Sequence, residues 1–95
     1  GFINFIVKNL AFEFEDGRLS VLKLLNEIVR KMPQELLDDQ AAFLFLPLAT
    51  RLVNDEAAAC RQSVAQNICT IFYKVYVLSV HFISIFTFVI SFRFR

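Results

Sequence analysis

Acidic side chains that could take part in acid–base or metal chemistry occur in two short clusters. Glu13, Glu15 and Asp16 lie within the segment FEFEDG, and Asp38 is followed directly by Asp39. Paired carboxylates can act as general acids and bases or bind a divalent cation. However, the single histidine of the chain lies far from both clusters, and adjacent residues on a helix point in different directions. We therefore interpret these carboxylates as solvated loop and cap residues, and we predict no enzyme activity, metal or cofactor.

Four basic residues of one predicted helix could contact phosphate groups. Arg18, Lys23, Arg30 and Lys31 are spread over about half of its circumference. Through Thr70 the chain carries seven basic and nine acidic side chains, which argues against strong RNA binding by this part alone. Two interpretations stay open: a solvated helix face, or a surface that contacts RNA or a protein partner.

The other reactive residue types lack catalytic motifs. Cys60 and Cys69 are nine residues apart, so on one helix they point to different faces and cannot pair with each other. We predict that both are buried thiols in a reducing compartment. The only glycines are Gly1 and Gly17, which excludes a glycine-rich phosphate loop, and no serine lies in a GxSxG or SxxK motif.

The spacing of apolar residues predicts helices through most of the first seventy residues. These segments are Phe2–Leu10, Arg18–Met32, Gln40–Val53 and a helix that begins near Glu56. The acid-rich segment Phe12–Gly17 predicts a loop in which Asp16 caps the next helix. Pro33 should end the second helix, and residues 34–39 should form at most a short helical turn. We expect the apolar stripes of the second and third helices to pack on each other.

Three residues mark a helical hairpin. Pro47 lies inside one predicted helix, where it removes a backbone donor and should cause a bend near Phe43–Pro47. Asp55 lies at the predicted turn and Arg61 in the following helix. Together with Cys60, these positions resemble the HEAT repeat, whose hairpins bury their apolar faces by stacking. The predicted fold class is all-α: HEAT-like hairpins of an α-solenoid, with an apolar C-terminal helix or tail.

A narrower resemblance extends over Phe5–Gln62 and is most pronounced in FEFEDGRLSV, PQELLDD and Leu44–Asp55. These residues resemble the Utp-twenty family, also called "down-regulated in metastasis", whose members are giant nucleolar HEAT-repeat scaffolds of the small-subunit processome. The resemblance implies a non-catalytic scaffold fragment that acts in ribosomal RNA processing and ribosome biogenesis in the nucleolus. It implies contacts with other processome proteins, pre-ribosomal RNA and neighbouring repeats. It also implies that Asp55 caps the second helix of the hairpin and that Arg61 bridges to an adjacent repeat.

The composition changes near Thr70, because all nine acidic residues precede it and half of the twelve phenylalanines follow it. We therefore divide the chain into helical repeats at 1–70 and an apolar tail at 71–95. Val75–Phe92 has the minimum length of a membrane-spanning helix, although alternating apolar residues from Phe86 onward also allow a strand. One alternative is a single-pass membrane protein with a helical soluble part. Another is translated intron sequence, since the amino acids of the tail have thymine-rich codons.

Overall fold

The computed structural model describes residues 1–93, apart from the side chains of residues 78–82. The helices in this range are α1 (Phe2–Leu10), α2 (Glu15–Lys31), α3 (Gln34–Asn54), α4 (Ala58–Phe72), the π-helical η1 (Tyr73–Val77) and α5 (Leu78–Arg93). Residues 1–93 contain no strand, which confirms the predicted all-α class of helical hairpins. The last two residues of the predicted tail lie outside this description.

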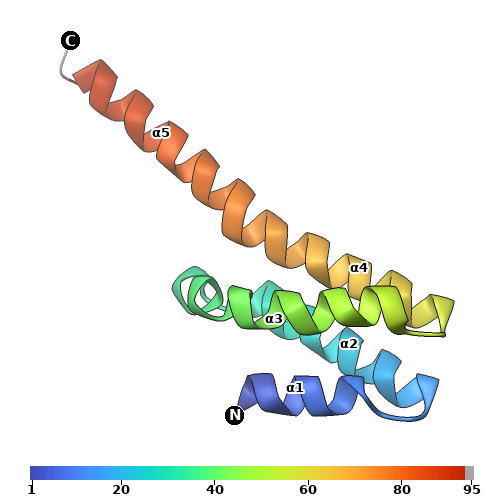
Figure 1. Cartoon of the computed structure of the whole chain (residues 1–95). Coiled ribbons are helices and arrows are strands. Elements are labelled where there is room, and N and C mark those ends of the chain that lie inside the picture. Colours follow the sequence, from blue (N-terminus) through green and yellow to red (C-terminus); the bar gives the residue numbers. More distant parts are fainter. Residues whose placement is uncertain (94–95) are drawn as a thin grey trace.

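Successive helices reverse direction, so that α1 to α4 form a bundle of antiparallel hairpins (Figure 1). The helical rod formed by α4, η1 and α5 then continues out of the bundle (Figure 1). The radius of gyration is 16.4 Å, against about 12 Å for a compact chain of this length. The projecting rod explains the difference.

The core lies between α2, α3 and α4. Its fully buried apolar residues come from all three helices: Leu22, Leu25 and Val29 of α2, Leu37, Leu44 and Leu48 of α3, and Cys60, Val64 and Ile71 of α4. The apolar stripes of α2 and α3 belong to the same core cluster, and α4 packs against both helices. The α1 helix covers one side by packing Ile6 and Leu10 on α2 and α3.

The second helix begins three residues earlier than its apolar stripe indicates. Glu15 and Asp16 form the first turn of α2, where carboxylates interact favourably with the helix dipole. The predicted cap at Asp16 is therefore wrong; the residue at the cap position is Phe14, in extended conformation. Gly17 lies under the ring of Phe12, and a Cβ atom at this position would collide with that ring.

The third helix is longer than predicted. It begins at Gln34, directly after Pro33, and continues without interruption through Pro47 to Asn54. Residues 34–39 are thus part of α3 rather than a separate turn. The first turns of α3 are seen almost along their axis in Figure 1, whereas the rest of the helix runs across the view, so the helix changes direction. Pro47 cannot donate a backbone hydrogen bond to Phe43, which gives a physical reason for a bend in this region.

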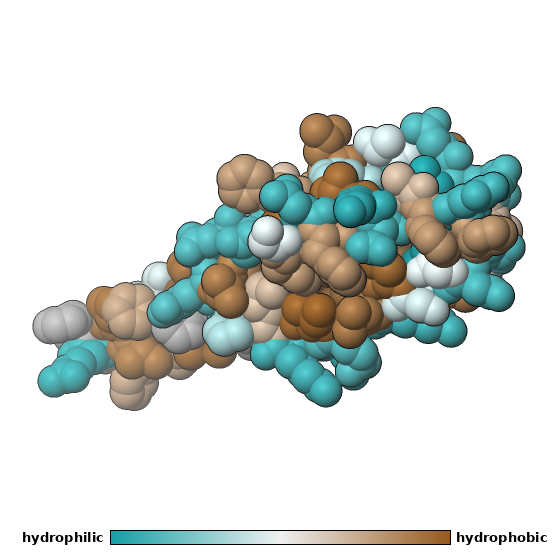
Figure 2. Space-filling model, turned by 90° about the horizontal axis from the view of Figure 1, so that it is seen from below, coloured by the Kyte–Doolittle hydropathy of each residue, from teal (hydrophilic) through white to brown (hydrophobic). Residues whose placement is uncertain are grey.

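The α5 helix makes few contacts with the rest of the chain beyond η1. Its apolar side chains from Ile83 to Phe92 are exposed. Figure 2 shows hydrophobic residues along this narrow extension, whereas hydrophilic residues gather over the wide end of the molecule. Residues 86–93 are helical, so the strand interpretation was wrong. None of the helices within residues 1–93 combines the length and hydropathy needed to cross a membrane.

Candidate functional site

The Asp55 carboxylate, at the α3–α4 turn, accepts four hydrogen bonds. Arg18 of α2 donates from Nε to Oδ2 over 2.9 Å and from Nη2 to Oδ1 over 3.0 Å. Arg51 donates from Nη2 to Oδ2 over 2.8 Å, and the backbone N–H of Ala57 donates to Oδ1 over 2.9 Å. Only 4% of the Arg18 side chain and 1% of the Asp55 side chain are exposed. This bidentate pair is therefore a buried ion pair between two hairpins.

The environment of the pair stabilises both charges. Burial by itself would raise the pKa of Asp55, but the hydrogen bonds from Arg18, Arg51 and Ala57 outweigh it and hold that pKa well below its usual range. The hydrogen bond to Asp55 raises the pKa of Arg18 despite the opposing effect of burial. Both side chains of the pair therefore stay ionised at neutral pH, so the ion pair persists there.

Further hydrogen bonds extend this contact to the backbone. Arg18 Nη1 donates to the carbonyl oxygens of Phe12 and Glu13, both over 2.9 Å, and Arg61 Nη1 donates to the carbonyl oxygen of Asp55 over 2.7 Å. We call Arg18, Arg51, Asp55 and Arg61 the Asp55 cluster. It joins the α1–α2 loop to the α3–α4 turn.

The cluster changes the role expected for Arg18. The sequence left two interpretations open for Arg18, a solvated face or a contact with RNA or a partner. Both are wrong for this residue, because it is 3% exposed and its guanidinium is occupied. While this fold is intact, Arg18 cannot reach a phosphate. The sequence does indicate this burial. Arg18 precedes the buried residues Leu22, Leu25 and Val29 by four, seven and eleven residues, which places it on the same face of the helix.

Pro47 and the two cysteines lie outside the Asp55 cluster and differ in exposure. Pro47 is half-buried within α3 and makes no contact with the cluster that the structure records. Cys60 is buried, its Sγ lies 3.7 Å from the carbonyl oxygen of Glu15, and burial raises the pKa of its thiol. Cys69 is exposed, which corrects the expectation that both thiols are buried.

A second polar contact closes the opposite end of α2. The Lys74 ammonium donates to the carbonyl oxygens of Val29 over 2.8 Å and Met32 over 2.7 Å, and the Gln34 amide donates to the carbonyl oxygen of Lys74 over 2.6 Å. A cation at this place satisfies carbonyl groups that the end of a helix leaves free.

Lys23 and Arg30 lie beside a shallow pocket of about 290 Å³ between α2 and α4. We call its lining the α2–α4 seam: Lys23, Asn26, Glu27, Arg30, Ser63 and Gln66. Arg30 makes one long hydrogen bond, 3.4 Å from Nη1 to Glu27 Oε1. The seam thus brings together two of the four predicted basic residues. Ser63 and Gln66 were missed, although their three-residue spacing on α4 puts them on one face.

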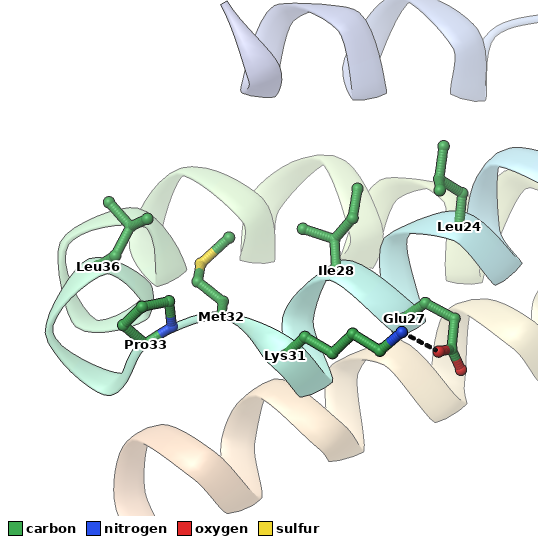
Figure 3. A pocket seen from close by; sticks show the side chains of 7 residues that line it. All are labelled: Leu24, Glu27, Ile28, Lys31, Met32, Pro33 and Leu36. Carbon is green, nitrogen blue, oxygen red and sulfur yellow. Dashed lines mark ion pairs between the residues drawn. The ribbon is translucent and has the colours of Figure 1, made fainter.

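Lys31 lies on a different side of α2, at the edge of an apolar groove of about 460 Å³ (Figure 3). Leu24, Ile28 and Met32 of the α2 side and Leu36 of α3 point the same way, toward α1 (Figure 3). Lys31 and Glu27 form an ion pair of 3.6 Å along the edge. The four basic residues of the predicted helix therefore occupy three environments: Arg18 is buried, Lys23 and Arg30 line the seam, and Lys31 borders the groove.

The acidic residues form no centre of their own. Asp16, Asp38 and Asp39 are exposed, and Asp38 accepts a hydrogen bond from Gln34 over 3.0 Å. In the described part of the chain, no three His, Cys, Asp or Glu side chains are grouped so that they could hold a metal ion.

No protein-family model matches the chain. It is 36% identical over 72 residues to U3 small nucleolar RNA-associated protein 20 of Schizosaccharomyces pombe. It is 37% identical over 71 residues to the protein of the same name from Saccharomyces cerevisiae. The matches cover 76% and 75% of this chain, but only 3% of each relative. The similarity confirms the resemblance stated from the residues alone.

Proposed function

Since the chain is a Utp-twenty-like polypeptide, we propose that it is a non-catalytic scaffold segment of a small-subunit processome protein that acts in ribosomal RNA processing and ribosome biogenesis. The observation that carries this proposal is the identity of more than a third over three quarters of the chain, to proteins named for association with a small nucleolar RNA. In this proposal the chain works in the nucleolus, with pre-ribosomal RNA and other processome proteins as partners.

The exposed face of α3 supports a scaffold role. Phe43, Leu46 and Val53 expose 65%, 74% and 79% of their surface. They lie on the side of the helix away from the buried residues Leu44 and Leu48. A helix with apolar residues on two sides is typical of an α-solenoid, in which each hairpin packs on its neighbours. In this proposal neighbouring HEAT-like repeats cover the exposed face.

The roles of the repeat residues are also part of the proposal. Asp55 does not cap α4 as the resemblance implied, because the cap position is Ala57 and no side chain caps this helix. Asp55 instead organises the α3–α4 turn by accepting the Ala57 N–H, and Arg61 donates to the carbonyl oxygen of the same turn. Among the described residues, only one nitrogen of the Arg61 guanidinium donates a hydrogen bond, the one to the carbonyl oxygen of Asp55. A contact from Arg61 to an adjacent repeat is therefore compatible with this geometry.

A segment exchange tests the proposed function. In the Schizosaccharomyces pombe protein, the matching segment is replaced by the matching residues of this chain, and precursor ribosomal RNA is followed by northern blotting. We expect normal processing and a nucleolar protein. A matched chimera with Leu25→Asp, which puts a charge in the core, should accumulate precursor. If the first chimera is present at normal levels but fails in processing, or if the second processes normally, the proposal is wrong.

The division into repeats at 1–70 and a tail at 71–95 is a proposal that we modify. Ile71 is fully buried in the core, and Lys74 binds the end of α2, so the packed unit includes residues up to η1. We therefore propose that any boundary lies after Val77. Sequencing of the spliced transcript tests the intron hypothesis for the tail; one exon that continues through Arg95 would exclude it.

A further inference from the structure

We propose that the α2–α4 seam binds the phosphate backbone of RNA, with Lys23 and Arg30 as its cations and Ser63 and Gln66 as neutral donors. This inference rests on the proposed function and deepens it by assigning one RNA-binding surface. It replaces the broader expectation of contacts from all four basic residues of the predicted helix.

The donors of the seam are free to act on a ligand. The side chains of Lys23, Ser63 and Gln66 make no hydrogen bond or ion pair within residues 1–93, and Arg30 makes only its long bond to Glu27. By contrast, the Asn26 amide donates to Thr70 over 3.2 Å and is mostly buried, so it forms the floor. An ammonium, a guanidinium, a hydroxyl and an amide are the groups that proteins direct at phosphate and sugar oxygens.

The arrangement of charge favours a linear polyanion. Lys23 and Arg30 are seven residues apart on α2, which separates them by about 10 Å along the helix axis and leaves them on nearly the same side. Neither α4 nor η1 contains an acidic residue, so Glu27 is the only carboxylate that lines the seam. Two cations in a row can neutralise two phosphates of one strand, and the neutral donors between the helices suit ribose hydroxyls.

Glu27 limits the strength of this site. Its carboxylate lies 3.4 Å from Arg30 and 3.6 Å from Lys31, so it competes with an incoming phosphate for the Arg30 guanidinium. All three side chains are more than half exposed, so these pairs are weak. Removal of the Glu27 charge should therefore strengthen RNA binding with little effect on the fold.

Fluorescence anisotropy with the purified 95-residue chain tests the proposal. The probe is a fluorescein-labelled single-stranded RNA of mixed sequence, titrated at several salt concentrations. The test variant is Lys23→Gln with Arg30→Gln. The matched control is Lys8→Gln with Arg93→Gln, which removes the same charge from exposed residues that do not line the seam. Circular dichroism verifies that all variants keep the helical fold.

We expect the test variant to bind RNA about tenfold more weakly and to reduce the salt slope by about 1 to 2, the loss of two phosphate contacts. The control should stay within about twofold, because only non-specific attraction changes. Glu27→Gln should bind about two- to threefold more tightly, because Arg30 is released.

Three outcomes would overturn the proposal. The first is that the unmodified chain does not bind the probe, and the second is that the test and control variants lose affinity equally. The third is that oligoglutamate displaces the RNA probe at a lower concentration of negative charges than unlabelled RNA does. The last result would identify the seam as a site for an acidic protein. Each of these would leave the segment exchange unaffected, so failure of the seam and failure of the scaffold function can be told apart.

Discussion

Arg18 and Arg30 belong to the same helix but have opposite environments. Arg18 is 3% exposed and donates to Asp55 and to two backbone carbonyl groups. The Arg30 side chain is 64% exposed and makes one weak pair with Glu27. A guanidinium therefore forms a buried intramolecular contact at the start of α2, as Arg18, and is exposed to solvent near its end, as Arg30.

The difference follows from angular position on the helix. Arg18 continues the spacing of the buried residues Leu22, Leu25 and Val29, whereas Arg30 follows Val29 directly and so points to another side. Lys74 repeats the lesson, because it lies three residues after the buried Ile71 and also turns inward to backbone carbonyls. A charged residue in the register of a core stripe indicates an intramolecular contact.

The largest expected effect comes from removing the buried cation. Arg18→Met should destabilise the chain by about 3–5 kcal/mol or prevent folding, because it leaves the Asp55 charge buried without its bidentate partner. Arg30→Met is the matched control and should change stability by less than about 0.5 kcal/mol. Urea denaturation followed by circular dichroism measures both. If the two substitutions lowered the free energy of unfolding equally, the buried Arg18 would contribute no more to stability than the exposed Arg30.

Acid should remove the stability that the buried Arg18–Asp55 pair contributes. The pKa of Asp55 in the folded chain lies below its unfolded value, so its contribution to stability is complete above the unfolded pKa of about 4 and is lost as the pH falls further. We expect the free energy of unfolding to drop by about 2–3 kcal/mol between about pH 5 and pH 2.

In Asp55→Asn this part of the pH dependence should disappear, although the variant is less stable at neutral pH. Glu27→Gln serves as the control that keeps it. An unchanged acid slope in Asp55→Asn would show that other carboxylates cause the acid sensitivity.

Loss of the Lys74 contact should have an intermediate effect. Lys74→Met removes the donor that satisfies carbonyl groups of Val29 and Met32, and we expect a loss of about 1–3 kcal/mol. Lys31→Met, on the same end of α2, should cost less than about 0.5 kcal/mol, because the Lys31 side chain is 81% exposed. Thermal melts compare the pair. If Lys74→Met has the same melting temperature as the unmodified chain, the stability of the packed unit does not depend on this contact from η1.

The smallest effect should come from Glu27. In Glu27→Gln two exposed ion pairs with Arg30 and Lys31 are lost, which should change the free energy of unfolding by about 0.3–1 kcal/mol at low salt and by less at high salt. Urea denaturation at two salt concentrations measures this. A loss as large as that of Lys74→Met would mean that the seam is a structural contact and not an open surface.

Local patterns determined the class of the fold. Apolar spacing predicted helices in the right regions, and Pro33 and Asp55 lie at the two junctions that flank α3. The same residues indicated the Utp-twenty resemblance that the relatives bear out. Two helix boundaries were predicted wrongly: α2 begins at Glu15 and α3 at Gln34, because acidic first turns and a preceding proline are as compatible with helix starts as with loops.

The sequence by itself therefore determined that this chain is a series of antiparallel helices with apolar stripes, since both follow from periodicity and from turn residues close in the chain. Only the tertiary structure decided which polar residues meet. Arg18 and Asp55 are 37 residues apart and Lys74 and Val29 are 45 apart. Their contacts depend on how α4 and η1 pack on neighbouring helices, and no pattern within one helix specifies what lies opposite it.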